Sequence, residues 1–599
     1  MQRTSILLLL LTLAAPLLAQ SPAGQKSAEQ PPALAALADE FMAAFFDFQP
    51  SAGTRAGLHQ YDARMEDFSA ARVARQIALY KDFERRFAAL DTTGWAEWPR
   101  ADREMMLAFV RSRIFELSPE GVPFWRINPD FYSSVASDSA FVLMGRNYAT
   151  PEARLRALVA REQKLPALFA EAKKNLDNPP QVYTEVAIEQ LPGIVSFFQN
   201  DAPPAFAGVG DAELQKEFQS STAATVAALN DYLAWLKTEL LPRSKGDYRL
   251  GAGRLSKKLL YEEMVDTPLD RLLAAAYENL HRNQHEYERV AKLIDPAKTP
   301  RQLQTSLEAE HPAADALLAS FGQEMQNVRR FADAHAIIDT PGQSLPRIEE
   351  TPAFMRALTS ASMDAPGPFE TQATEAFFNV TLPDASLTAA QREEFLSGFN
   401  HGVIVSTSIH EVIPGHYEQY LWNAQVRSRI RQFLSLDLSN IGSHFAGTNV
   451  EGWAHYTEQM IIDEGYGRTA GVAEEKDLPY LKLRLGQLQD ALLRNARFVV
   501  AIEMHTGKMS FGQAVAFFEK EGRQTHPTAV MEARRGTSDP TYLMYTLGKV
   551  EILKLRADLE QREGKNFRLR DFHDELMRQG VAPWSLVRRA LLGNSSAAL

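Results

Sequence analysis

The sequence contains no cysteine among its 599 residues. This absence excludes disulfide bridges, thiolate zinc fingers, iron–sulfur clusters, a cysteine nucleophile and a lipidated cysteine anchor. Any metal ion that the protein binds must therefore be held by nitrogen and oxygen ligands. A Gly-x-Ser-x-Gly motif is also missing, which argues against a serine hydrolase of the α/β type.

Positive charge is in deficit, with 64 Lys and Arg against 75 Asp and Glu, a formal net charge of −11. An acidic chain without a long basic run is a poor match for phosphates, so we expect no nucleic-acid partner. Hydrophobic residues make up 45% and charged residues 23%, values typical of a folded protein.

Long apolar runs are confined to the N-terminus. Residues 1–19 carry Arg3 and then an apolar run from Ile6 to Leu18, as in a secretory signal peptide cleaved after Ala19. Residues 20–32 are rich in Ser, Pro, Ala and Gln and are expected to form a flexible linker. We predict an exported protein, periplasmic or extracellular, with no stable membrane insertion after cleavage. The alternative is an uncleaved anchor, which the shortness of the run and Pro16 disfavour.

The rest of the chain is dominated by helical patterns. Apolar residues recur at intervals of three and four, as in Leu272, Leu273, Tyr277 and Leu280, whereas alternating segments are few and short. No internal repeat of fixed period is present, which argues against a solenoid. The sequence predicts a mainly α fold.

Histidines are concentrated in one window. Five of the 13 lie between residues 401 and 455, and they are His401, His410, His416, His444 and His455. The order His410-Glu411-Val-Ile-Pro-Gly-His416 resembles a zinc-binding H-E-x-x-H helix, but its second histidine lies at i+6 instead of i+4. A local bulge at the Pro-Gly pair would bring His416 back beside His410. The alternative is two structural histidines.

A second segment, residues 449–458, carries three polar side chains on one helical face. Glu451, His455 and Glu458 stand at i, i+4 and i+7. They suit additional metal ligands, and the alternative is a row of surface ion pairs.

Together, HEVIPGHYEQ and EGWAHYTE resemble the two signature segments of the DUF885 family, which is grouped with zincin-like metallopeptidases. Residues 61–69, 250–252 and 539–549 are similar to other family segments. The resemblance implies one catalytic domain over residues 33–599, a large helical zincin-like fold with a central cleft and possible division into two lobes. It places the metal site in 395–460 and a tyrosine segment in 532–550.

By the same resemblance, His410, His416 and Glu451 bind one Zn²⁺ per chain, although another divalent metal would also suit nitrogen and oxygen ligands. Glu411 would activate the water as general base. His455 departs from the family pattern, which is often apolar there. His455 and Glu458 are thus open as supporting contacts or additional ligands.

The remaining candidates concern the substrate. Tyr545 is the predicted oxyanion donor, with Tyr542 second, and Arg535 beside Arg534 could bind a C-terminal carboxylate. We therefore expect an exported zinc-dependent metallopeptidase for short peptides. One alternative is a metal-dependent esterase or amidase acting on non-peptide substrates. Another is a non-catalytic helical binding protein, and the presence of Glu411 disfavours this second alternative. The oligomeric state is left open.

Overall fold

The structure is a computed structural model, which describes residues 30–342, 344–352, 356, 359–436, 438, 445–594 and 599. The predicted signal peptide, most of the predicted linker, and His444 lie outside these residues. Among the described residues, no helix has the length and apolar character needed to cross a membrane.

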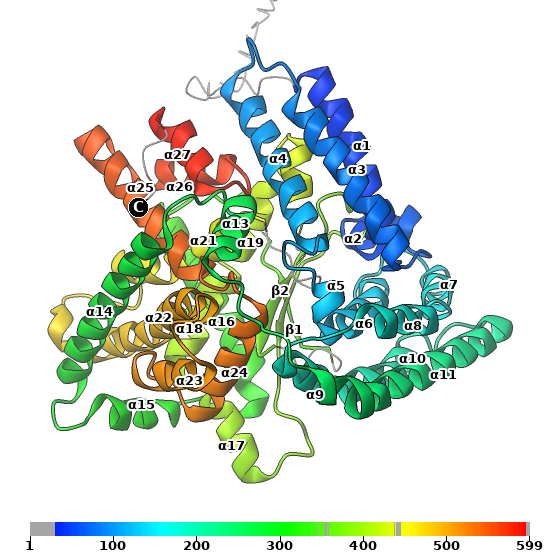
Figure 1. The fold of residues 1–599 in the computed structure, drawn as a ribbon. Coiled ribbons are helices and arrows are strands. Elements are labelled where there is room, and N and C mark those ends of the chain that lie inside the picture. Colours follow the sequence, from blue (N-terminus) through cyan, green and yellow to red (C-terminus); the bar gives the residue numbers. More distant parts are fainter. Residues whose placement is uncertain are drawn as a thin grey trace, which may run out of the picture.

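Helices make up most of the described chain, and this confirms the predicted mainly α class. In Figure 1 the first helices occupy the right of the view. The helices of this N-terminal part are α1 (Pro32–Phe48), α2 (Pro50–Arg55), α3 (Ala70–Ala88), α4 (Glu97–Leu117), α5 (Phe124–Ile127), α6 (Pro129–Met144), α7 (Pro151–Glu162), α8 (Leu165–Asn175), α9 (Gln181–Ser196), α10 (Ala202–Ala205), α11 (Ala212–Trp235) and α12 (Leu241–Arg243).

Most of the later helices lie on the left of Figure 1. They are α13 (Ala252–Glu262), α14 (Leu269–Ile294), α15 (Pro300–Glu308), α16 (Leu317–Ala334), α17 (Ala389–Ser397), α18 (His401–Glu411), α19 (His416–Asn423), α20 (Arg429–Leu434), α21 (Gly447–Asp463), α22 (Leu478–His505), α23 (Phe511–Lys520), α24 (His526–Ser538), α25 (Met544–Glu563), α26 (Leu569–Arg578) and α27 (Trp584–Leu592).

The sequence sets several helix starts directly. Thr299, Thr388 and Ser510 each begin a helix with a reciprocal capping box, in which a glutamine three residues later bonds back to the cap. These boxes satisfy backbone N–H groups that no helical carbonyl reaches.

One small sheet lies between the two groups of helices (Figure 1). Its strands are β1 (Arg347–Glu350), β2 (Ala361–Asp364) and β3 (Phe377–Val380), in the order β1-β3-β2. β1 is parallel to β3 and β2 is antiparallel to it, so β2 is an edge strand. Thr381 N–H donates to the Ser360 carbonyl at 2.9 Å. Because antiparallel pairs alternate, the backbone N–H and C=O of Ala361 and Met363 point away from β3.

The larger apolar core joins the two ends of the chain. It includes Leu34 of α1 and Val587 of α27, both at most 1% exposed. A second core lies among α13, α14 and α22–α24. The helices α18, α21, α22 and α25 pack on one another. Of the predicted metal-binding residues, His410 lies on α18, Glu451 on α21 and His416 at the start of α19.

Candidate metal centre

The two histidines of the H-E-x-x-P-G-H motif lie on separate helices. Helix α18 begins after Asn400, whose side chain accepts a hydrogen bond from Val403 N–H, and ends at Glu411. Val412 has φ −115° and ψ −87°, and α19 begins at His416. A helix break therefore replaces the predicted bulge, because Pro414 supplies no N–H and Val412 leaves the helical conformation.

Gly415 allows the turn to lie directly against the end of α18. A Cβ atom at this position would be 1.8 Å from the His410 carbonyl oxygen and 2.4 Å from that of Ile409. The same turn is held from α21, where Trp453 Nε1–H donates to the Pro414 carbonyl at 2.7 Å. The two signature segments thus contact each other, and this contact fixes where His416 begins α19.

The side chains of His410, His416 and Glu451 meet at one point. Glu451 Oε2 lies 3.5 Å from His410 Nε2 and 3.6 Å from His416 Nε2. One ligand atom from each of the three residues lies within 4.8 Å of the others. The two imidazole rings are nearly perpendicular, at 85°, with centroids 4.8 Å apart.

These separations suit one small metal ion. Ligand atoms around tetrahedral zinc, each about 2.0–2.1 Å from the ion, lie roughly 3.4 Å apart. The two measured histidine-to-glutamate distances, 3.5 and 3.6 Å, are close to this value. Glu451 Oε2 is also buried and has no hydrogen-bond partner among the described residues, as expected of an atom reserved for a metal.

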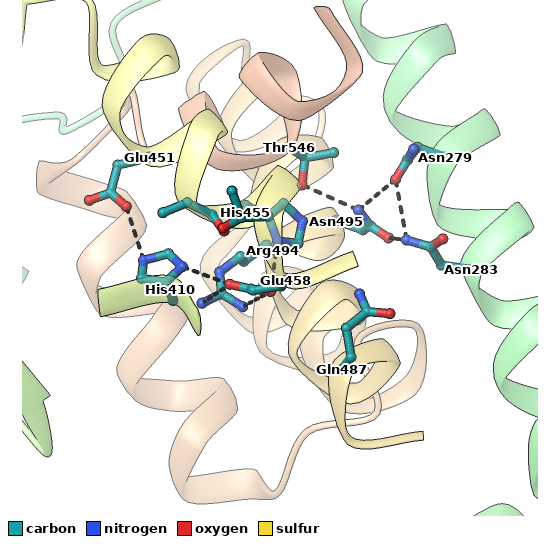
Figure 2. Close-up of polar contacts among 12 residues, drawn as sticks. Asn279, Asn283, His410, Glu451, His455, Glu458, Gln487, Arg494, Asn495 and Thr546 are labelled. Atoms are coloured by element: carbon teal, nitrogen blue, oxygen red, sulfur yellow. Dashed lines mark hydrogen bonds and ion pairs between the residues drawn. The ribbon is translucent and has the colours of Figure 1, made fainter. Parts of the chain in front are cut away.

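Glu458 orients His410 from behind. Its Oε1 lies 2.6 Å from His410 Nδ1, which leaves Nε2 to face Glu451 and His416. Figure 2 shows His410 between Glu451 and Glu458, with Arg494 and His455 beside Glu458. Arg494 Nη2 is 3.1 Å from Glu458 Oε1. A carboxylate that fixes the ring and tautomer of a metal-binding histidine is the usual supporting contact of such sites.

His455 lies behind the three convergent side chains. It is fully buried, and its Nδ1 lies 3.1 Å from Glu458 Oε2. Its Nε2 has no partner among the described residues. The geometry places His455 in contact with Glu458 and outside the group formed by His410, His416 and Glu451.

The local charges keep the carboxylates of Glu451 and Glu458 ionised. Burial would lower the pKa of His410, but the neighbouring Glu451 and Glu458 carboxylates raise it to about 9. Burial would raise the pKa of Glu451, but His410 and His416 hold it well below its usual range. Without a metal, His410 therefore keeps a proton at neutral pH, and a bound cation would displace that proton.

Glu411 faces a cavity of about 690 Å³. His410, His416, Glu451 and Tyr545 line the same cavity. Glu411 Oε2 accepts a hydrogen bond at 3.1 Å from the outward N–H of Met363 in β2. This contact anchors the predicted general base beside the predicted metal ligands.

Tyr545 reaches the site from α25. Its hydroxyl donates to Glu451 Oε1 at 3.1 Å. The approach of α25 to α21 depends on two glycines, because a Cβ at Gly452 would lie 2.5 Å from Gly548 Cα. Burial, together with the Glu451 carboxylate, raises the pKa of Tyr545, so the phenol keeps its proton at neutral pH.

The other three residues considered for substrate binding do not line the cavity. Tyr542 is fully buried in the second core. Arg535 is paired with Asp539, Nη2 to Oδ2 at 3.0 Å, and Arg534 is paired with Glu189 at 2.9 Å. Of the five clustered histidines, His401 is exposed at the start of α18.

Sequence reasoning missed three contributors to the site. They are Arg494, the N–H of Met363, and Arg146, a cation on the cavity wall. The sequence contains a weak indication of Arg494, because this charged residue interrupts the apolar pattern around Leu492 and Ala496. The other two residues gave none, because they approach the site only through the tertiary fold.

Comparisons with known proteins agree with this fold. The solved structure of a candidate lipoprotein of unknown function from Shewanella oneidensis matches this fold with a TM-score of 0.76 and 23% sequence identity. The match covers 93% of this chain and 99% of the Shewanella chain. A candidate lipoprotein from Colwellia psychrerythraea has TM-score 0.76 and 17% identity, covering 94% of this chain and 98% of its own. No curated protein matches the chain. The model of the family described as "Bacterial protein of unknown function (DUF885)" matches residues 50–591, so the chain belongs to the DUF885 family.

Proposed function

We propose that this protein is an exported zinc-dependent metallopeptidase that cleaves short peptides. The observation that carries the proposal is the convergence of His410 Nε2, His416 Nε2 and Glu451 Oε2 in a cavity that also receives Glu411. Two imidazoles and one carboxylate are a ligand set of catalytic zinc sites, in which a fourth position stays open for water.

The donor atoms fit the ion in chemistry as well as in spacing. His410 presents Nε2 because Glu458 occupies Nδ1. Glu451 Oε2 is a buried carboxylate oxygen without a hydrogen-bond partner among the described residues. When bound, zinc supplies a Lewis acid that polarises a carbonyl and lowers the pKa of a water from 15.7 toward ~7. Manganese, cobalt or nickel would be accepted by the same ligands.

Side chains of this protein would transfer the proton of the attacking water and stabilise the negative charge that develops on the carbonyl oxygen. Glu411 is positioned by Met363 to take a proton from the attacking water and to deliver it to the leaving nitrogen as the C–N bond breaks. Tyr545 carries a phenolic proton at the cavity wall and would donate it in a hydrogen bond to the oxygen that becomes negative. Glu458 and Arg494 keep the His410 ring in place.

The edge of β2 favours a peptide over another carbonyl substrate. Of the outward backbone groups of β2, the Met363 N–H is bound to Glu411 and the Ala361 carbonyl accepts a hydrogen bond from the Thr359 hydroxyl at 2.6 Å. The Ala361 N–H and the Met363 carbonyl are left for main-chain hydrogen bonds to an extended peptide. An ester or a non-peptide amide would use the same proton transfer but would gain nothing from this edge. A non-catalytic binding protein would not need Glu411 for metal binding.

Export is supported by the signal-like residues 1–19 and by the two structural neighbours, which are described as candidate lipoproteins. A thioether lipid anchor requires cysteine, and this sequence has none. We propose export to the periplasm or the cell exterior without such an anchor.

Digestion of a mixed peptide library, read by mass spectrometry, tests the proposal. We expect cleavage by the zinc-loaded protein, none after chelation, and recovery when zinc is added back. Glu411→Gln should retain zinc and lose turnover, and Tyr545→Phe should retain zinc and lose roughly 100-fold in kcat. Full activity of metal-free protein, or of Glu411→Gln, would show that the proposed chemistry is wrong.

A further inference from the structure

Arg146 is held rigidly on the wall of the cavity. It follows α6, and its side chain is 13% exposed. Nη1 donates to the Glu375 carbonyl at 2.5 Å and to the Ala373 carbonyl at 3.5 Å. The guanidinium carbon lies 5.8 Å from the centroid of the Phe377 ring. These contacts hold one side of the guanidinium, and the other side faces Asp364, which also lines the cavity.

The second terminal nitrogen of Arg146 is not used fully. Nη2 lies 2.8 Å from Asp364 Oδ1, which balances the charge. The alignment is not that of a hydrogen bond, and this buried nitrogen has no hydrogen-bond partner among the described residues. Asp364 is 34% exposed, more than Arg146 itself. A carboxylate entering the cavity can therefore take the N–H that Asp364 does not accept.

Two other charged groups on the cavity wall have partners of their own. Arg55 is ion-paired with Asp138. Glu370 Oε1 accepts backbone N–H groups of Thr371, Gln372 and Ala373, and its Oε2 faces the ring of His59. Arg146 differs from Arg55 in position, because its partner Asp364 directly follows Met363, which binds Glu411.

The distance from Arg146 to the proposed general base is short. Asp364, which faces Arg146, directly follows Met363, whose N–H is bound to Glu411. The two contacts span 2.8 and 3.1 Å, and the Cα atoms of adjacent residues are about 3.8 Å apart, so an extended peptide of about four residues, at ~3.3 Å each, is long enough to reach from Arg146 to Glu411.

We propose that Arg146 binds the free C-terminal carboxylate of the substrate and so restricts cleavage to bonds within about four residues of the C-terminus. The inference rests on the proposed peptidase function and names its substrate class, peptides with an unblocked C-terminus. Water adds its OH to the scissile carbonyl carbon and its proton to the leaving nitrogen, so a short peptide with a free carboxylate is released.

Binding to the Glu411→Gln protein tests the proposal without turnover. The probes are two N-acetylated tetrapeptides of the same sequence, one a free acid and one a C-terminal amide, with affinity measured by calorimetry. We expect the amide to bind about 10- to 100-fold more weakly, the value of one charge-assisted interaction. In the double variant with Arg146→Gln the two peptides should bind equally. Arg146→Lys should preserve part of the preference for the acid, because it keeps the charge but loses the fork.

Arg103→Gln is the matched control. Arg103 also donates to two backbone carbonyls, those of Phe87 and Ala88, but it does not line the cavity. Its substitution should leave the preference for the free acid intact. In active protein, Arg146→Gln should raise KM for free acids by the same factor and leave kinetics with amides unchanged.

Equal binding of acid and amide by the protein with Arg146 intact would overturn the proposal, and this comparison depends on no Arg146 variant. A peptide amide ending in glutamate provides a further arm. If it bound as tightly as the free acid, Arg146 would select acidic side chains and the terminal role would be wrong. Failure of the peptidase function is distinguishable, because it would abolish zinc-dependent cleavage while leaving the binding difference in place.

Discussion

Gly415→Ala is the substitution whose effect on the metal centre follows most directly from the structure. The new Cβ would lie 1.8 Å from the His410 carbonyl oxygen. A carbon and a carbonyl oxygen in contact lie about 3.3 Å apart, so the two atoms must separate by about 1.5 Å. Gly415 precedes His416 and His410 carries the carbonyl, so the separation falls between two of the predicted ligands.

Metal–ligand distances in a well-formed site lie within about 0.2 Å of their ideal values. A displacement of about 1.5 Å should therefore lower zinc affinity by at least about 100-fold. Competition with a chromophoric zinc chelator measures this affinity, and circular dichroism verifies that the helices remain. Gly512→Ala in α23 is the matched control, since no atom lies within 4 Å of the added Cβ. It should bind zinc as tightly as the unaltered protein.

Unchanged zinc affinity in Gly415→Ala would refute this reasoning. It would mean that the turn relaxes without moving His416, or that His416 is not a ligand. Loss of zinc together with loss of the helical signal would show that Gly415 is needed for folding. The metal site would then be tested by substituting His410, His416 and Glu451 themselves.

Three other predictions concern named side chains. Glu451→Ala should lower zinc affinity sharply in a chelator competition, whereas His455→Gln should not; the reverse order would identify His455 as the third ligand. Glu458→Gln should weaken zinc binding about 10- to 100-fold by releasing the His410 ring, and equal affinity would remove that role. Burial raises the pKa of Glu162 from 4.5 to about 7, so the folded state loses stability as pH rises through this window. Urea unfolding should show that Glu162→Gln abolishes a decline of up to about 3 kcal/mol, and parallel pH profiles would contradict it.

The sequence was sufficient to predict the mainly helical class and the placement of the EGWAHYTE polar side chains on one side of a helix. A period of 3.6 residues places Glu451, His455 and Glu458 on one side of a helix, and that spacing survives in α21. The same spacing does not show which of these side chains would bind a metal and which would only hold a metal-binding residue in place. Glu451 faces the cavity and Glu458 faces Arg494 because of what packs against each turn of α21, which a single segment does not encode.

The form of the Pro-Gly segment was harder to predict. Proline and glycine indicate a distortion after Glu411, but the choice between a bulge and a helix break depends on Trp453, which binds the Pro414 carbonyl from another helix. The edge strand β2 has only four residues, too few for an alternating pattern to be distinguished. Arg146 is likewise placed by the carbonyls of a distant loop. These features depend on long-range contacts.

Anomalous diffraction at the zinc edge, from crystals of the zinc-loaded protein, would show directly whether His410, His416 and Glu451 bind zinc. We expect one strong peak per chain, bonded at about 2.0–2.2 Å to His410 Nε2, His416 Nε2 and a Glu451 oxygen. A peak bonded to His455 instead of Glu451, or no peak beside His410 and His416 in zinc-saturated crystals, would contradict it.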